Sequence, residues 1–127
     1  RLSNLRGRTI AVLGLVYTPN TNTLRRSAAV ELCRELVDAG ARVHAFDPAI
    51  REIPDAAPAL QLAPDLASAL HQADAAVVCT EWPEFRQADW PKLITGMRQA
   101  LVIDPNRFLK DSLAPIKGVD HASVGNP

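Results

Sequence analysis

Thr9-Ile10-Ala11-Val12-Leu13 is an apolar run that leads into a polar loop, Gly14-Leu15-Val16-Tyr17-Thr18-Pro19-Asn20-Thr21-Asn22-Thr23-Leu24-Arg25-Arg26-Ser27. An amphipathic helix pattern follows directly after this loop. A buried strand, a polar loop with arginines and a helix start form a common phosphate site. The first turn of a helix offers free N–H groups, and arginine adds a planar fork of donors. This order of residues points to a nucleotide or another anion as the ligand.

The bulk composition is that of one ordinary globular domain. The chain has 127 residues, of which 47% are hydrophobic and 22% are charged. That length suffices for one domain with its own core and is too short for two. Fourteen basic and fourteen acidic residues give a formal net charge of zero, which argues against nucleic acid or an anionic membrane as the partner. Since no apolar run approaches the roughly 20 residues of a membrane span and no secretory signal is visible, we expect a cytoplasmic protein or a piece of one.

Hydrophobic patterning predicts a parallel sheet. Near-continuous apolar runs are typical of parallel strands that are buried on both faces. They occur at Thr9–Leu13, Ala75–Cys79 and Ala100–Ile103. Further strands are expected at Arg42–Phe46, at Leu60–Leu62 and, as a late edge strand, at His121–Val124.

Helical periodicity fills the gaps between these strands. The first helix is expected between Ser27, its N-cap, and Gly40, a left-handed residue after its last turn. A second is expected at Leu66–Ala73 behind Asp65, and a third at Trp90–Met97. Strands that alternate with helices imply a parallel sheet with right-handed crossovers. The predicted fold is therefore an α/β, Rossmann-like three-layer sandwich with a mostly parallel sheet of about five to six strands.

The residues that follow the strands are the candidates for binding. In such sheets, ligands bind outside the carboxyl ends of the strands where the strand order reverses. We expect that point between the first strand and Ala75–Cys79. The adjoining turns carry Gly14 to Arg25, Thr80 to Phe85, and Asp104 to Arg107. Several roles stay open. Arg25 and Arg26 either bind an anion or are solvated loop charges, and Tyr17 either stacks on a base or packs on the sheet edge. Trp82 and Phe85 either line a pocket or close the core.

The first turn does not carry a dinucleotide fingerprint. That motif, G-x-G-x-x-G, needs two further glycines after Gly14, and the chain has Val16 and Pro19 at those positions. Asp47 ends the second strand, where such folds often bind a ribose hydroxyl, but an Asp-Pro turn is the favoured interpretation. The sequence therefore argues against an independent NAD site.

Other chemistries find little support. Cys33 and Cys79 lie inside apolar patterns and are expected to be buried, reduced thiols. No histidine has a second ligand at metal-binding spacing, so no metal is proposed. Ser27 lacks a nucleophile elbow. No catalytic residue is proposed.

Ordered motifs cover nearly the whole chain and resemble one protein family. Leu5–Leu15 is similar to the motif L-x-G-K-x-I-x-V-L-G-L, and Val16–Ser27 is similar to A-F-K-P-x-T-D-D-x-R-E-S. Gly40–Pro48 is similar to G-A-x-V-x-x-Y-D-P, and Thr80–Phe85 is similar to T-E-W-x-E-F. Ile103-Asp104 is similar to the strand before D-G-R-N, and Ser123–Gly125 is similar to the start of S-V-G-R-P. On these residues the chain resembles the C-terminal, UDP-binding domain of the UDP-glucose/GDP-mannose dehydrogenase family.

The resemblance implies a function within a larger enzyme. Family members oxidise C6 of a nucleotide sugar from an alcohol to a carboxylate and use two NAD in succession. Residues 1–127 would then form a single UDP-sugar-binding domain, while NAD is bound mainly by a domain that this chain lacks. The catalytic cysteine has no counterpart here, so the isolated chain should have no turnover. The implied partners are the UDP-sugar, the rest of the parent dehydrogenase and a second subunit in a homodimer.

The resemblance also assigns residues. Tyr17 sits at the aromatic position beside the sugar nucleotide, and Thr18 replaces a lysine that contacts this ligand. Arg25 matches the arginine that reaches the NAD phosphates. Arg107 stands one place after the family's substrate-binding arginine, whose own position is Asn106. Because of these departures, and of Asn126 in the closing motif, a second hypothesis stays open: a divergent, non-catalytic binding or assembly module.

Overall fold

The computed structural model of the chain describes residues 5–16, 28–53 and 58–122. Helices and strands alternate along these residues. In chain order they are β1 (Thr9–Leu13), α1 (Ala28–Asp38), β2 (Arg42–Phe46), β3 (Leu60–Leu62), α2 (Leu66–Leu70), β4 (Ala75–Val78), α3 (Pro83–Arg86), α4 (Trp90–Thr95), β5 (Leu101–Ile103), α5 (Lys110–Leu113) and β6 (Asp120–Ala122). No helix in this described part is both long and apolar enough to span a membrane.

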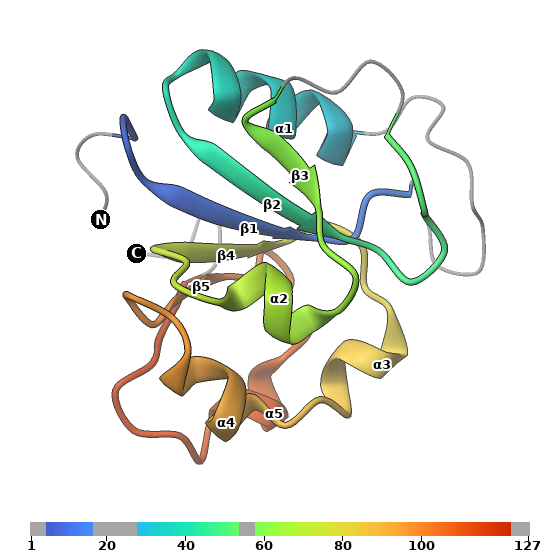
Figure 1. Ribbon diagram of the computed structural model, residues 1–127. Coiled ribbons are helices and arrows are strands. Elements are labelled where there is room, and N and C mark those ends of the chain that lie inside the picture. The colour runs from blue at the N-terminus through green and yellow to red at the C-terminus, as the bar shows by residue number, and fades with distance from the viewer. Residues whose placement is uncertain (1–4, 17–27, 54–57, 123–127) are drawn as a thin grey trace.

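The described strands form one six-stranded sheet in the order β3-β2-β1-β4-β5-β6, and all neighbours are parallel (Figure 1). This confirms the predicted Rossmann-like fold, with a sheet that is parallel throughout. β1, β2 and β3 have the predicted bounds, and β4 and β5 are one residue shorter than predicted. The edge strand β6 begins one residue earlier than predicted, and the end predicted for it lies outside the described residues.

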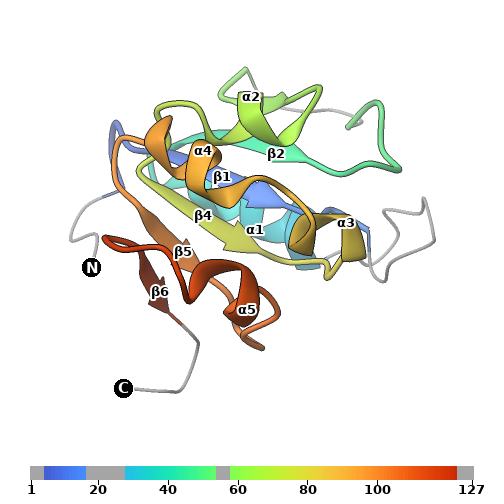
Figure 2. The same cartoon turned by 90° about the horizontal axis from the view of Figure 1, so that it is seen from below.

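The sheet separates two layers of helices. α1 lies on one face, and α2, α3, α4 and α5 lie on the other (Figures 1 and 2). Side chains alternate between the faces along each strand, so that Ile10 and Val12 of β1 belong to the core under α1, and Ala11 and Leu13 belong to the opposite core. The alternation explains why continuous apolar runs, rather than alternating ones, were the signal for these strands.

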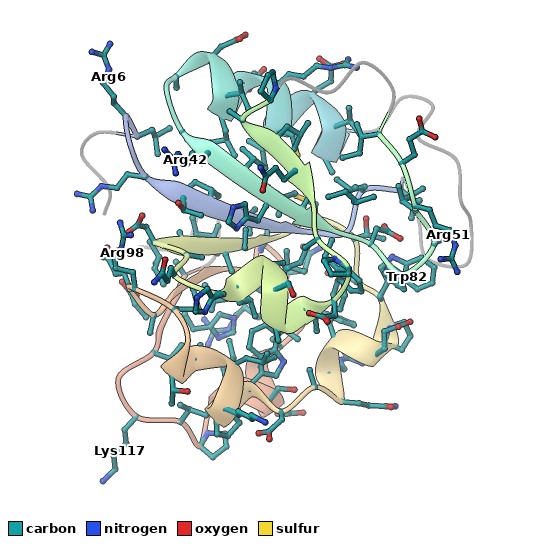
Figure 3. The ribbon with its side chains drawn as sticks, viewed as in Figure 1. Arg6, Arg42, Arg51, Trp82, Arg98 and Lys117 are labelled. Carbon is teal, nitrogen blue, oxygen red and sulfur yellow. The ribbon has the colours of Figure 1, made fainter. Side chains whose placement is uncertain are left out.

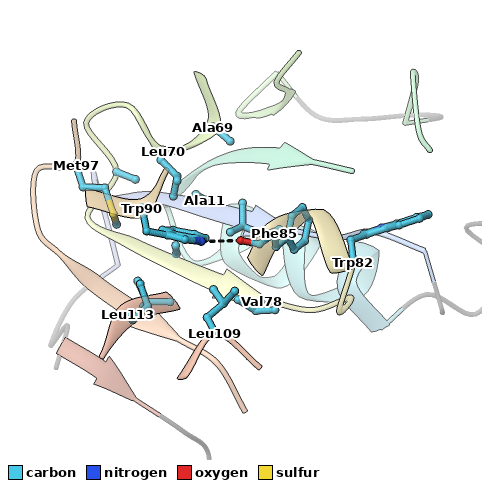
Figure 4. Close-up of a cluster of buried hydrophobic side chains, with 14 of the residues drawn as sticks. Ala11, Ala69, Leu70, Val78, Trp82, Phe85, Trp90, Met97, Leu109 and Leu113 are labelled. Carbon is cyan, nitrogen blue, oxygen red and sulfur yellow. Dashed lines mark hydrogen bonds between the residues drawn. The ribbon is translucent and has the colours of Figure 1, made fainter. Parts of the chain in front are cut away.

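The larger core is built around two aromatic residues that are fully buried. Trp90, at the start of α4, and Phe85, in α3, have no exposed surface. The Trp90 indole Nε1 donates a hydrogen bond to the Phe85 carbonyl oxygen at 2.6 Å, which satisfies the one polar group of the ring (Figure 4). Phe85 therefore closes the core, one of the two roles that the sequence left open for it.

Two helices end earlier than their hydrophobic periodicity predicts. α2 ends at Leu70 rather than Ala73, because Gln72 turns into the left-handed region at φ 59° and directs the chain toward β4. α4 ends at Thr95 rather than Met97. The predicted caps that fall within the described residues are confirmed: the Asp65 side chain accepts from the Ser68 N–H, and Gly40 has φ 96°. The Ser27 cap lies outside the described residues.

Gly14 ends β1 in a conformation and a space that only glycine fits. Its φ is 94°, and its N–H donates to the Phe46 carbonyl at 2.7 Å. A Cβ on Gly14 would lie 2.4 Å from the Thr80 Cβ and 2.5 Å from the Thr80 backbone nitrogen. Backbone and a β-branched side chain cannot move aside cheaply, so the close approach of β1 to β4 depends on this glycine.

We expect Gly14→Ala to lower the free energy of unfolding by about 3 kcal/mol, as the left-handed strain and the overlap with Thr80 add up. Gly118→Ala is the matched control, because Gly118 has φ 85° and a Cβ added to it would meet no atom within 4 Å, and it should cost only about 1 kcal/mol. Urea titrations followed by circular dichroism measure both values. Equal losses would show that the overlap is relieved without cost.

His44 of β2 should make the free energy of unfolding of the domain depend on pH. Burial, and to a smaller degree the charge of Arg42, lower the pKa of His44 below its usual value of 6.5. The unfolded chain then takes up the proton first, so stability should fall as the pH drops from about 6.5 toward the lower folded pKa. His44→Gln should flatten this part of the pH profile. Thermal melts between pH 5 and 8, roughly the titration range of histidine, test this.

Candidate functional site

The turns that follow β1, β2, β4 and β5 lie along one edge of the sheet, because all these strands are parallel. The strand order reverses between β1 and β4, which is where doubly wound sheets bind their ligands. The predicted pairing of β1 with β4 is thus confirmed. Arg6, Arg42 and Arg98 lie toward the opposite, amino end of the sheet, and Arg51 and Trp82 lie toward this carboxyl edge (Figure 3).

Asp47, directly after β2, is the centre of this edge. Its carboxylate is 2% exposed and accepts four hydrogen bonds. Oδ2 accepts from the N–H groups of Leu15 and Val16 at 2.7 and 3.1 Å and from the Trp82 indole at 3.0 Å. Oδ1 accepts from the Ala49 N–H at 2.8 Å. We call Asp47 and these four donors the Asp47 clamp, since it joins the chain segments that follow β1, β2 and β4.

The Asp47 clamp decides two questions that the sequence left open. The bond to Ala49 is the expected Asp-Pro turn, which is confirmed. Because both oxygens are occupied by the chain itself, Asp47 is not available to a ribose hydroxyl. Trp82 is 7% exposed, its indole nitrogen is bound to Asp47, and it belongs to the larger core, which is one of the two roles that the sequence left open for it.

Thr80 connects the ends of β1 and β4. Its hydroxyl donates to the Val16 carbonyl oxygen at 2.6 Å, and its N–H and that of Cys79 both reach the Leu13 carbonyl oxygen. The chain is thus held on both sides up to Val16, the last described residue before the loop. Three sequence-predicted site residues, Tyr17, Thr18 and Arg25, lie in that loop and outside the described residues.

The turn after β5 presents the fourth predicted site residue. Arg107 is exposed and has φ 56°, and its N–H donates to the Asp104 carbonyl oxygen at 3.0 Å. The neighbouring Asn106 side chain donates to Glu81 Oε2 at 3.0 Å, which ties this turn to the segment after β4. The guanidinium of Arg107 has no described hydrogen bond or ion pair. The fold therefore brings a cation without a described partner to the predicted binding edge.

Asp104 anchors this turn from inside. Its side chain is fully buried; Oδ2 accepts from the Leu109 N–H at 2.7 Å and lies 3.0 Å from His121 Nε2. Sequence reasoning missed this pair and the Asp47 clamp. The only local signal was a carboxylate directly after an apolar strand, because the partners other than Ala49 lie 17 to 35 residues away.

Neither cysteine has the properties of a nucleophile. Both thiols are free. Burial raises the pKa of Cys33 to about 12 and that of Cys79 to about 11, so both stay protonated at neutral pH. The prediction of buried, reduced thiols is thus confirmed for Cys33, whereas Cys79 is reduced and only partly buried.

Hollows among the described residues include one on each side of the central strands. One, of about 510 Å³, lies beyond β2 and β3 and has Arg51 on its wall. The other, of about 470 Å³, lies between α1 and the ends of β4 and β5, and no charged side chain lines it. The described part of the carboxyl edge thus offers an anionic ligand the exposed cation of Arg107 on its turn and, farther along, the hollow that has Arg51 on its wall.

We expect Asp47→Asn to lower the free energy of unfolding by about 3 kcal/mol, because the new amide group would face N–H donors that then lose their acceptor. In nuclear magnetic resonance spectra, the Trp82 indole N–H signal should move, and that of Trp90 should not. Asp65→Asn, at an exposed helix cap where asparagine is also favourable, is the control and should cost well under about 1 kcal/mol. An unchanged Trp82 signal in Asp47→Asn would contradict the clamp.

Comparison with known proteins gives one consistent result. Residues 11–111 match the family model of the UDP-glucose/GDP-mannose dehydrogenase family, UDP binding domain. The chain is similar to the UDP-glucose 6-dehydrogenase of Rhizobium meliloti, with 40% identity over 98% of this chain and 29% of that protein. It is also similar to the UDP-glucose 6-dehydrogenase TuaD of Bacillus subtilis, with 32% identity over 99% of this chain and 28% of that protein. The chain therefore spans under a third of the length of these relatives.

Solved structures agree with the sequence matches. The UDP-D-ManNAc dehydrogenase of Pyrococcus horikoshii superimposes with a TM-score of 0.79 at 27% identity, over 96% of this chain and 26% of that one. A UDP-glucose dehydrogenase of Pyrobaculum islandicum gives a TM-score of 0.72 at 28% identity, over 98% of this chain and 27% of that one. Because the family model covers most of the chain and the fold agrees, the chain belongs to the UDP-glucose/GDP-mannose dehydrogenase family and corresponds to its C-terminal UDP binding domain.

Proposed function

We propose that this chain is the nucleotide-sugar-binding domain of an NAD-dependent UDP-sugar 6-dehydrogenase, which oxidises the C6 alcohol of the sugar to a carboxylate. The observation that carries the proposal is the position of Arg107, exposed and without a described partner at the carboxyl edge of a domain of this family. A pyrophosphate needs cationic donors that are not already neutralised by the protein, and Arg107 meets this need.

In this proposal the ligand contacts come from two turns. Tyr17 packs beside the sugar nucleotide, Thr18 offers a hydroxyl where relatives have a lysine, and Arg107 binds the phosphates. Arg25 reaches the phosphates of NAD from outside the cofactor's own domain. The Asp47 clamp and the Asn106–Glu81 bond support the proposal, because they hold the ends of both turns along one edge.

The residues of this chain do not fit a resident NAD. The turn after β1 has a single glycine, and Asp47, where a ribose acceptor would stand, is saturated by its own chain. We therefore assign NAD mainly to a domain outside this chain, and the catalytic cysteine likewise. Residues 1–127 would form one domain without turnover of its own. In the complete enzyme, we expect pairing into a homodimer through a central segment outside this chain and a cytoplasmic location.

We expect the chain to bind UDP weakly, with a dissociation constant on the order of 1 mM, because half of the pocket is missing. Chemical-shift changes during a UDP titration, supported by calorimetry, should map to the turns after β1 and β5. Arg107→Ala should weaken binding roughly tenfold or more through the loss of a charge-assisted hydrogen bond.

Arg42→Ala is the matched control, because Arg42 is equally exposed but lies toward the amino end of the sheet (Figure 3). It should leave the UDP affinity unchanged. No heat and no shift at millimolar UDP would contradict the proposed function. An equal effect of the two arginine variants would contradict the role of Arg107 and indicate unspecific attraction of the phosphates.

A further inference from the structure

The two faces of β4, β5 and β6 are covered unequally. On the face toward α2, α4 and α5, the side chains of Ala76, Val78 and Val102 are at most 4% exposed. On the face toward α1, Ala75 and Leu101 near the amino ends of β4 and β5 are 1% exposed, whereas the side chains nearer the carboxyl edge are only partly buried. These are Val77, Cys79, Ile103 and Ala122, which we call the open strip. Since the strands are the same, the difference comes from what packs on each face.

The topology explains why the open strip is uncovered. Right-handed crossovers that run outward in opposite directions from the centre of a sheet place their helices on opposite faces. The crossover from β1 to β2 places α1 over β2 and β3. The crossovers toward β4, β5 and β6 place α2, α3, α4 and α5 on the other face (Figures 1 and 2). α1 borders the open strip, since Ala29 and Leu32 line the same hollow as Cys79, and no other helix of the described residues lies on this face.

The chemistry of the open strip suits apolar side chains and not a polar ligand. The hollow of about 470 Å³ beside α1 includes three of its residues. The walls are formed by Val16, Ala28, Ala29, Leu32, Val77, Val78, Cys79, Ile103 and Pro105. None of these side chains is charged, and the only polar atom among them is the Cys79 sulfur, whose pKa burial raises to about 11. A phosphate or a sugar would find no side-chain partner there.

We propose that the open strip is the docking surface for the apolar face of an amphipathic helix from the remainder of the parent polypeptide. Parallel sheets are stable when both faces are covered, and helices are the usual cover. The chain spans only 29% and 28% of the lengths of its two relatives, so most of the polypeptide that would supply this helix lies outside it. The proposal rests on the proposed function, since it takes this chain as one domain of such an enzyme.

The position of the open strip gives the docked helix a second consequence. The hollow reaches the carboxyl edge through Val16 and Pro105, next to the turns that carry the proposed ligand contacts. A helix seated there forms a wall beside the nucleotide site while it covers the sheet. One contact would thus both fix the orientation of the two domains and exclude water from one side of the site.

Cys79 offers a reporter for docking, because it lies in the open strip, while Cys33 has no exposed surface. The experiment compares this chain alone with a chimera in which it replaces the matching portion of the Rhizobium meliloti enzyme. Both are alkylated with N-ethylmaleimide under native conditions, and each site is followed by peptide mass spectrometry. We expect Cys79 to react roughly tenfold or more slowly in the chimera. If the chimera does not fold, the chain is mixed with the separately purified remainder and labelled in the same way.

Ile116→Cys provides the matched control site, since Ile116 is also partly buried but packs on the opposite core. Its reaction rate should be the same in both proteins. Unchanged labelling of Cys79, or equal protection of both sites, would overturn the proposal. Protection of Cys79 that grows with the concentration of the chain alone would overturn it in favour of a second copy as the occupant.

The UDP titration separates this proposal from the proposed function. UDP binding by the chain together with unprotected Cys79 would refute the docking surface and leave the function standing. Protection of Cys79 without any UDP binding would refute the function and leave the docking surface standing.

Discussion

The buried carboxylate of Asp47 is the interaction on which the carboxyl edge depends. An ionised group at 2% exposure is stable only if donors replace its water, and here four N–H groups do so. They come from the extension of β1, from the turn after β2 and from Trp82, which precedes α3. The described segments after β1, β2 and β4 thus depend for their positions on this one side chain.

Buried aspartates recur at the ends of strands in this domain. Asp104 follows β5 and holds the turn of Arg107 through Leu109 and His121. Asp74 precedes β4 at the opposite edge, accepts from the Thr9 N–H and lies 3.7 and 3.6 Å from the guanidinium groups of Arg8 and Arg98. At the amino edge the carboxylate of Asp74 thus lies beside two arginines, whereas at the carboxyl edge Asp47 accepts from backbone and indole N–H groups, and Asp104 contacts the Leu109 N–H and the His121 ring. This difference leaves Arg107 available to a ligand.

The strands of the sheet could be predicted from the sequence, whereas the contacts between the turns could not. Continuous apolar runs predicted β1 to the residue and β4 and β5 to within one residue, because burial on both faces gives a strong signal. The four-residue helices α3 and α5 are too short to show a period, and α2 ended early because Ala73 is buried by a turn rather than by a helix. The bond between Asp47 and Trp82 joins residues 35 positions apart, beyond any local pattern. Arg107 lies at the carboxyl edge, and its binding role stays a prediction, as do those of Tyr17, Thr18 and Arg25.

The outermost strands limit how this domain associates with other chains. As far as the chain is described, β3 and β6 contain only three residues each, and exposed polar side chains, Gln61 and Asp120, stand on them. So short a border offers few free backbone groups to a strand of another molecule, which protects the protein from fibre-like growth by strand addition.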